Sequence, residues 1–213
     1  MNTPAPLTLS TLRRMAPVYP VNFIEAKVVA ERQANRLAAA WHAADRSIRE
    51  SDITGLSRIA IERRTFTAAS QHSGSSQWTN GRWVIALNDS ESVARQRFTT
   101  CHELKHIIDA GCSSTYSQLT EQEIERLCDH FAGCLLMSKR AIYRLWGDGL
   151  RTPEALATAC RVSLAAMKVR LSVIGLPINS GNRGRTGCRR AFPSAPLPRT
   201  LSHPIVATTG AAP

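Results

Sequence analysis

The sequence lacks the features that would place it in a membrane, in a secretory pathway or among disulfide-rich proteins. None of its 213 residues belongs to an apolar run long enough to span a bilayer. The first twenty residues contain four prolines and no apolar core of a signal peptide. The six cysteines show no Cys-x-x-Cys spacing, so we expect reduced and buried thiols. Together these absences predict a cytoplasmic protein.

Acidic residues are also scarce, and the C-terminal part of the chain has none. The sequence has 27 Lys and Arg against 16 Asp and Glu, for a formal net charge of +11, and no acidic residue follows Glu154. Residues 177–213 are rich in Pro, Gly, Ser and Arg and have little to bury, so we expect them to be disordered. Such a basic tail can contact DNA phosphates without sequence specificity.

One His-Glu-x-x-His motif is present, formed by His102, Glu103 and His106. Residues four apart lie on one face of a helix, so the two imidazoles can bind one metal ion, and zinc is the expected ion. Glu103 lies about 100° further around the helix. From there its carboxylate can reach a water molecule on the metal without acting as a ligand. The motif therefore predicts a general base beside an activated water.

The residues around this motif favour a helix. An apolar stripe at helical spacing consists of Cys101, Leu104 and Ile108. The expected boundaries are an N-cap at Asn88, Asp89 or Ser90, with Glu91 in the first turn, and an end at Gly111.

A catalytic zinc site needs a third protein ligand, and the best candidate is Glu125. Thr120 and Glu123 form a capping box that starts a second helix. Its apolar face consists of Ile124, Leu127, Cys128, Phe131 and Leu135. Asp129, four residues after Glu125, would accept a hydrogen bond from the far nitrogen of a ligand histidine. The alternative ligands are Asp129 itself, His130, Asp109, Cys101 and Cys112. A metzincin site is excluded because position 109 is not Gly and position 112 is Cys rather than His.

Two segments of the chain resemble the ImmA/IrrE metallo-endopeptidases. They read Arg95-Gln-Arg97-Phe98-Thr-x-x-His102-Glu103-x-x-His106 and Glu125-x-x-Cys128-Asp129-x-Phe131-Ala132-x-x-Leu135-Leu136-Met137, and a looser likeness runs from about residue 25 to 176. The resemblance implies one zinc ion per chain on His102, His106 and Glu125, with Glu103 as the catalytic carboxylate. Three residues depart from the usual pattern: Cys128 replaces Ala, Ser138 replaces Pro and Lys105 replaces a small residue.

The other patterns predict an α+β fold, with a small β-sheet and hairpin packed beside the two metal-bearing helices. Residues 22–44 should form a helix whose core positions are Ile24, Val28, Leu37, Ala38 and Trp41. Residues 56–64 alternate like a strand, and residues 67–77 read as a Ser-rich loop. Asn80-Gly81 is a type I′ hairpin turn. The strand after it, Arg82 to Asn88, would border the cleft as an edge strand and align an extended substrate, or it would simply cover a core.

The expected layout has four parts: a flexible segment at 1–20, a zinc peptidase core at 21–150, a short helical pair at 151–176 and the disordered tail at 177–213. The helical pair fits either a packing unit or a helix-turn-helix. We expect a zinc-dependent endopeptidase in which Glu103 is the general base. The family resemblance implies that the substrate is a DNA-binding helix-turn-helix repressor, cleaved to derepress stress or mobile-element genes. Two alternatives remain: a regulator that binds a repressor or antitoxin without cleaving it, with structural zinc, and a DNA-binding helix-turn-helix module.

Overall fold

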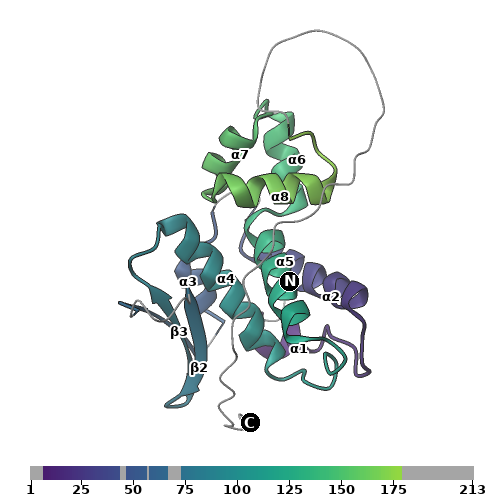
Figure 1. The fold of residues 1–213 in the computed structure, drawn as a ribbon, viewed down its shortest axis with the longest axis vertical. Coiled ribbons are helices and arrows are strands. Elements are labelled where there is room, and N and C mark those ends of the chain that lie inside the picture. The colour runs from purple at the N-terminus through teal and green to yellow at the C-terminus, as the bar shows by residue number, and fades with distance from the viewer. Residues whose placement is uncertain (1–6, 44–46, 57, 67–72, 179–213) are drawn as a thin grey trace, which may run out of the picture.

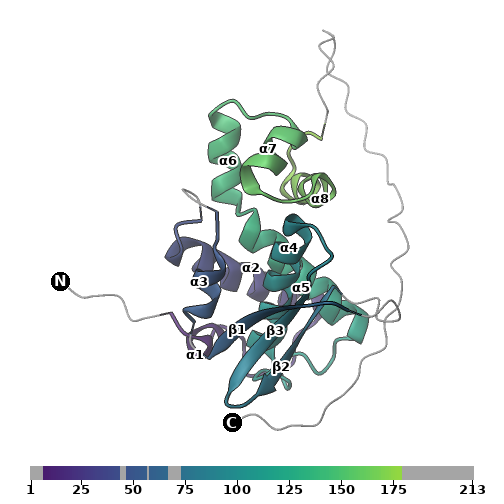
Figure 2. The same cartoon turned by 90° about the vertical axis from the view of Figure 1, so that its left-hand side faces the viewer.

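The computed structural model describes residues 7–43, 47–56, 58–66 and 73–178, and it has the expected α+β fold. Its elements, in chain order, are α1 (Leu9–Arg13), α2 (Phe23–Ala40), α3 (Glu50–Thr54), β1 (Ile59–Arg64), β2 (Gly74–Thr79), β3 (Arg82–Asn88), α4 (Val93–Asp109), α5 (Glu121–Leu136), α6 (Lys139–Gly147), α7 (Pro153–Cys160) and α8 (Leu164–Ile174). The sheet, α4, α5 and α2 follow one another as layers, and α6, α7 and α8 lie together at one end (Figures 1 and 2). Residues 179–213 of the expected tail lie outside the described residues.

The strands of the described sheet run in the order β1-β3-β2, with β1 parallel and β2 antiparallel to β3. The central strand is therefore β3, and both of its edges are paired. The expectation that Arg82–Asn88 is an edge strand that aligns a substrate was wrong. The physical reason is its composition, because residues 84–87 form an unbroken buried apolar run, which is typical of a strand covered on both faces.

The turn between β2 and β3 is the predicted hairpin turn. Asn80 has a φ of 49° and Gly81 a φ of 75°, and a type I′ turn requires positive φ at both residues. One residue further from the turn on each strand, Trp78 and Trp83 are paired across the strands with their rings edge to face and their centroids 5.6 Å apart.

The strand that precedes this turn begins at Gly74, inside the segment that the sequence predicted to be a loop. Its first four residues, Gly-Ser-Ser-Gln, show no apolar alternation and have low β-propensity. This strand is paired with β3 along its whole length. Its extended conformation is therefore stabilised by tertiary contact rather than by local preference.

The helix α2 packs against α5 through a row of small side chains. Four buried alanines repeat every fourth residue, at Ala26, Ala30, Ala34 and Ala38. Small side chains along this row let the two helices approach closely. Leu37, Ala38 and Trp41 are buried as predicted, but Ile24 and Val28 are 76% and 47% exposed. These two residues lie on the opposite side of the helix from the alanine row, so their assignment to the core was wrong.

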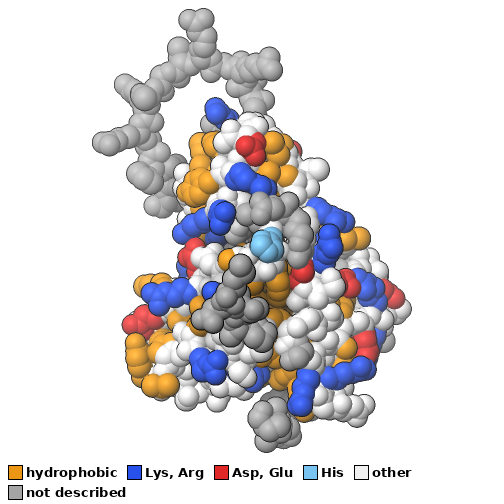
Figure 3. Space-filling model, turned by 180° about the vertical axis from the view of Figure 1, so that it is seen from behind, with side chains coloured by type: hydrophobic (Ala, Val, Ile, Leu, Met, Phe, Trp, Pro, Cys, Tyr) orange, Lys and Arg blue, Asp and Glu red, His pale blue; other side chains and the backbone are white. Residues whose placement is uncertain are grey.

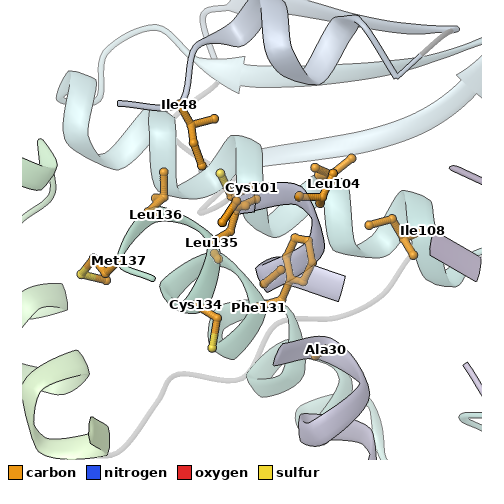
Figure 4. Packing of buried hydrophobic residues seen from close by; sticks show 14 of the residues in the cluster. Ala30, Ile48, Cys101, Leu104, Ile108, Phe131, Cys134, Leu135, Leu136 and Met137 are labelled. Atoms are coloured by element: carbon orange, nitrogen blue, oxygen red, sulfur yellow. The ribbon is translucent and has the colours of Figure 1, made fainter. Parts of the chain in front are cut away.

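The contact between α4 and α5 forms the centre of the core. Figure 4 shows Leu104 and Ile108 from α4 beside Phe131 and Leu135 from α5, with Ala30 of α2 close by. Burying one side chain of this size stabilises the fold by roughly 1.5–3 kcal/mol. Because these contacts hold the two helices in one register, they also set the positions of the polar side chains on the adjoining faces.

The N-terminal segment takes part in this core, so the expected flexible segment at 1–20 was wrong for the residues described. Leu12 of α1 is fully buried. Arg13 donates hydrogen bonds from Nε to the carbonyl of Ile108 (3.1 Å) and from Nη2 to that of Ile107 (3.0 Å). A cation is favourable at these last carbonyls of a helix. A Cβ at Gly111 would lie 2.9 Å from Arg13 Cδ, so glycine makes room for this side chain.

Helices α4 and α5 both begin with a side-chain cap, but only one cap was predicted. The α5 helix starts with the expected capping box of Thr120 and Glu123. The N-cap of α4 is Ser92, whose Oγ accepts a hydrogen bond from the Arg95 N–H (3.3 Å). Asn88 and Ser90 bond to each other in the preceding turn, so they were wrongly proposed as caps, and Glu91 precedes the helix.

The predicted helical pair is present as α7 and α8, joined by residues 161–163. The outward side chains of α8 include Leu164, Val169 and Val173, which are 37%, 66% and 55% exposed. Figure 3 shows apolar side chains in orange on this end of the molecule. A helix that reads DNA presents polar and basic side chains, so this surface disfavours DNA reading. Within the described ranges, no helix has both the length and the apolar character needed to cross a membrane.

Candidate metal centre

Two neighbouring helices supply the polar side chains of the candidate centre. His102, Glu103 and His106 belong to α4, and Glu125 belongs to α5. The helical period brings His102 and His106 to one face, with Nε2 atoms 3.2 Å apart and ring centroids 5.0 Å apart. The histidine pair is only partly exposed, at 15% and 29% of the side-chain surface.

The carboxylate of Glu125 bridges the two histidines. Its Oε2 lies 3.2 Å from His102 Nε2, and its Oε1 lies 3.2 Å from His106 Nε2. Zinc bonds of about 2.0–2.1 Å in a tetrahedral site place donor atoms roughly 3.3 Å apart. The structure thus brings these three side chains together at the spacing that ligands of one zinc ion require, and their donor types suit zinc.

Asp129 determines which ring nitrogen of His102 carries the proton. Its Oδ1 lies 2.9 Å from His102 Nδ1, so Nδ1 carries the proton and donates it to this hydrogen bond. The lone pair of His102 Nε2 then faces the Glu125 carboxylate, and this arrangement is favourable only with a cation between the two atoms. Either a proton or a metal ion can fill that role.

The pKa values of this cluster reflect the need for a cation. Burial lowers the pKa of His102, but hydrogen bonds to Asp129 and Glu125 outweigh burial and raise this pKa to about 9. Hydrogen bonds from His102 and His106 hold the pKa of Glu125 well below its usual range. The cluster thus favours a positive charge at the point where the two imidazoles and the carboxylate meet.

Cys128 is a further donor atom near the histidines. The Cys128 Sγ and one nitrogen of each of His102 and His106 all lie within 4.8 Å of one another, so the three could hold a metal ion. Cys128 is fully buried, and burial raises the pKa of its thiol well above the usual range. Glu125 is ionised and its oxygens are 3.2 Å from both rings. For this reason we regard Glu125 as the stronger third donor.

Cys128 was predicted to lie on the apolar face of the second helix and was not among the predicted metal ligands. The signal that would have identified it is its spacing, because it follows Glu125 by three residues and therefore shares a helix face with it. The departure from alanine in the family pattern pointed to the same position.

Glu103 lies next to this cluster and is 8% exposed. Its charge contributes to the raised pKa of His102, so it is within electrostatic reach of that ring. No hydrogen bond or ion pair joins its carboxylate to another described residue. A nearly buried carboxylate that lacks a protein partner is available to bind a water molecule.

The other acidic and histidine candidates for the third ligand are engaged elsewhere. Asp109 lies 2.6 Å from the Lys105 ammonium. His130 is directed to the opposite side of α5, where its Nε2 lies 3.5 Å from Cys134 Sγ. Burial and the nearby Lys27 charge lower the pKa of His130 to about 4. Neither Asp109 nor His130 joins the His102–Glu125 cluster.

The two cysteines named as alternative ligands are also separate from the histidines. Cys101 is packed in the core, and Cys112 Sγ lies 3.9 Å from the Arg13 carbonyl oxygen. Both proposals were wrong because these side chains face the core and α1. The prediction of reduced, buried thiols is confirmed for the five described cysteines, which are free and buried, while Cys188 lies outside the described residues.

Lys105, the third departure from the family pattern, does not add charge to the cluster. Its side chain is fully buried, and its Nζ lies 2.6 Å from Asp109 Oδ1, 2.9 Å from Gln33 Oε1 and 3.4 Å from Tyr116 Oη. The ammonium also lies 5.0 Å from the centroid of the Tyr116 ring. Lys105 is therefore neutralised by Asp109, and it ties α4 to α2 and to the loop before α5.

Residues 58–172, more than half of the sequence, match the family model of the IrrE N-terminal-like domain, which is a peptidase family. No curated protein matches the chain. Among solved structures, a Mycobacterium tuberculosis transcriptional regulator shares 16% sequence identity with a TM-score of 0.47. That alignment covers 77% of this chain and 52% of the regulator, so the chain spans about half of the regulator's length.

Proposed function

The chain belongs to the IrrE N-terminal-like domain family, and from this starting point we propose that it is a zinc-dependent endopeptidase. The proposal depends on one observation, the meeting of His102, His106 and Glu125 at mutual distances of 3.2 Å. Asp129 acts as the positioning residue that orients His102, and Glu103 is the carboxylate left available for proton transfer.

A zinc ion held by these residues would supply Lewis acidity, which polarises a peptide carbonyl and makes a water molecule nucleophilic. Glu103 would take a proton from that water and return it to the leaving amine. Asp129 would keep the proton of His102 on Nδ1, so that Nε2 stays available as a ligand. Lys105, paired with Asp109, takes no part in these steps.

We propose that the substrate is a DNA-binding repressor of the helix-turn-helix class, whose cleavage derepresses stress or mobile-element genes. Membership of the family supports this choice. The test is to incubate the purified protein, loaded with zinc, with the repressor encoded nearest its gene and to analyse the products by mass spectrometry. A single new N-terminus in the repressor is the expected result.

The variant Glu103→Gln tests the catalytic proposal. We expect it to bind zinc as the parent protein does and to lose cleavage by at least 100-fold, because general acid–base catalysis typically contributes about 10²–10⁴-fold. Glu121→Gln, at an exposed position in the first turn of α5, is the matched control and should cleave normally. Full cleavage by the Glu103 variant would exclude its role as the base.

A second function, a regulator that binds its partner without cleaving it, is favoured by one observation. Cys128 Sγ lies within 4.8 Å of one nitrogen of each histidine, so it could join the histidines and Glu125 as a fourth protein donor, and structural zinc sites have four protein ligands. Cys128→Ala distinguishes the two functions. If the centre is catalytic and has three ligands, Cys128→Ala should keep its zinc affinity within a few-fold. Loss of zinc from Cys128→Ala, together with normal regulation of the target genes by Glu103→Gln, would support the regulator.

A further inference from the structure

Three arginines from separate segments line one hollow at the junction of α4 with the C-terminal helices. Arg49 precedes α3, Arg97 belongs to α4, and Arg161 lies in the turn between α7 and α8. Together with Ser47 and Ile48 they enclose a cavity of about 330 Å³. On the face seen in Figure 3, Lys and Arg side chains are also numerous where the C-terminal helices meet the rest of the molecule.

No carboxylate neutralises these three arginines within the part of the chain that the structure describes. The nearby carboxylate of Glu50 is already paired with Arg63. Arg97 donates one hydrogen bond from Nη1 to the Ile48 carbonyl (2.8 Å), while its Nε is buried and has no acceptor among the described residues. A buried donor without an acceptor is unfavourable, and no carboxylate of the described residues forms an ion pair with these arginines to offset it.

The charges in the cavity also oppose one another. Burial is the largest influence and lowers the pKa of Arg97, and the positive charge of Arg161 lowers it further, while the nearby Glu50 carboxylate acts in the opposite direction. Arg161 has a φ of 56° at the C-cap of α7, a left-handed conformation that favours Gly or Asn. An arginine is thus held in an unfavourable backbone conformation beside a second, partly buried arginine.

We propose that this cavity is a binding site for the phosphate group of a small molecule. Guanidinium groups bind phosphate through paired, charge-assisted hydrogen bonds, and an anion among the three would supply the missing negative charge. The volume is at the lower end of the range for small-molecule sites. A concave cavity of this size fits a compact phosphate better than the phosphates of duplex DNA, which lie along an extended outer surface.

A ligand larger than phosphate has an adjoining surface to contact. Arg161 also lines a second hollow of about 510 Å³, whose apolar residues include Val93, Ala94 and Leu164. A molecule with its phosphate among the arginines can therefore place an apolar group against α4 and α8. Arg97 is on the same helix as His102, but the site is separate from the metal centre and does not depend on the proposed peptidase function.

The test is calorimetric titration of the full-length protein with pyrophosphate and with inorganic phosphate, at an ionic strength held constant with sodium chloride. Two variants remove charge from the cavity, Arg161→Asn and Arg49→Gln. Asparagine tolerates the left-handed conformation, so the first variant should fold normally. Arg151→Asn is the matched control, because Arg151 is exposed and does not line the cavity. This control removes one positive charge outside the cavity, so it also measures how much phosphate affinity comes from the net positive charge of the chain alone.

We expect saturable binding at one site per chain, weakened at least tenfold by Arg161→Asn and by Arg49→Gln and unchanged by Arg151→Asn. Three results would overturn the proposal: no saturable binding, an equal weakening by all three substitutions, or binding of duplex DNA that pyrophosphate does not displace. The last result would assign the arginines to nucleic acid. Circular dichroism and thermal unfolding of each variant establish that the fold is intact.

Discussion

Asp129 contacts the candidate centre only through His102, and this makes it a sensitive test of the geometry. Its carboxylate is 59% exposed and accepts the hydrogen bond from His102 Nδ1. We predict that Asp129→Ala lowers zinc affinity by about 10–100-fold, because partners of this kind orient the ligand ring and raise its basicity. Competition with a chromophoric chelator measures the change, and Glu121→Ala is the control. Zinc affinity equal to that of the parent protein would contradict the assigned role.

His102 also predicts how stability should depend on pH when zinc is removed. Its pKa is raised from 6.5 to about 9 in the folded protein, so folding favours the protonated ring. The resulting stabilisation is complete below pH 6.5 and is lost as the pH rises towards 9. We therefore expect the free energy of unfolding of the chelated protein, measured with urea, to fall across this interval. Asp129→Asn should flatten the dependence, and a stability that rises with pH would contradict the prediction.

Among the secondary-structure elements, the β2–β3 hairpin depends on the conformation of its turn. Gly81 has a φ of 75°, and no atom lies within 4 Å of the position of an added Cβ, so Gly81→Ala tests the conformation alone. We predict a loss of about 1–2 kcal/mol in the free energy of unfolding. The matched control is Gly147→Ala in α6, where space is also open and φ is not positive. This change should be neutral or stabilising by up to about 1 kcal/mol.

The elements differ in how far their sequences predict them. The helices α4 and α5 were predicted from local signals, the spacing of Leu104 and Ile108 and the capping box at Thr120. The proximity of Glu125 to the two histidines could also be predicted, because the helical period fixes the face of each helix on which these side chains lie. The strand β2 and the central position of β3 were missed, because pairing between distant strands has no signature within either strand. Ser92 was missed as a cap because Asn88 and Ser90 have the same local preference.

For the molecule as a whole, the candidate ligands join two helices that are also joined by the core. A zinc ion bound by His102, His106 and Glu125 would bind the folded chain and not the unfolded chain, and it would therefore add to stability by mass action. We predict that a chelator lowers the thermal unfolding midpoint by several degrees, since about 1 kcal/mol corresponds to roughly 2–4 °C in a protein of this size. Added zinc should restore the midpoint. A thermal unfolding midpoint that changes with neither chelator nor zinc would argue against a metal at this position.

The hydrogen bonds from Arg13 to Ile107 and Ile108 join the beginning of the chain to the helix end that follows His106. A protein shortened by its first fifteen residues would keep every proposed ligand and still lose the donors that cap this helix. Fraying there would reach His106 within one turn. Truncations designed to simplify crystallisation or to isolate the matched region at 58–172 would therefore be expected to release metal more readily, and an inactive fragment would not by itself show that the intact protein is inactive.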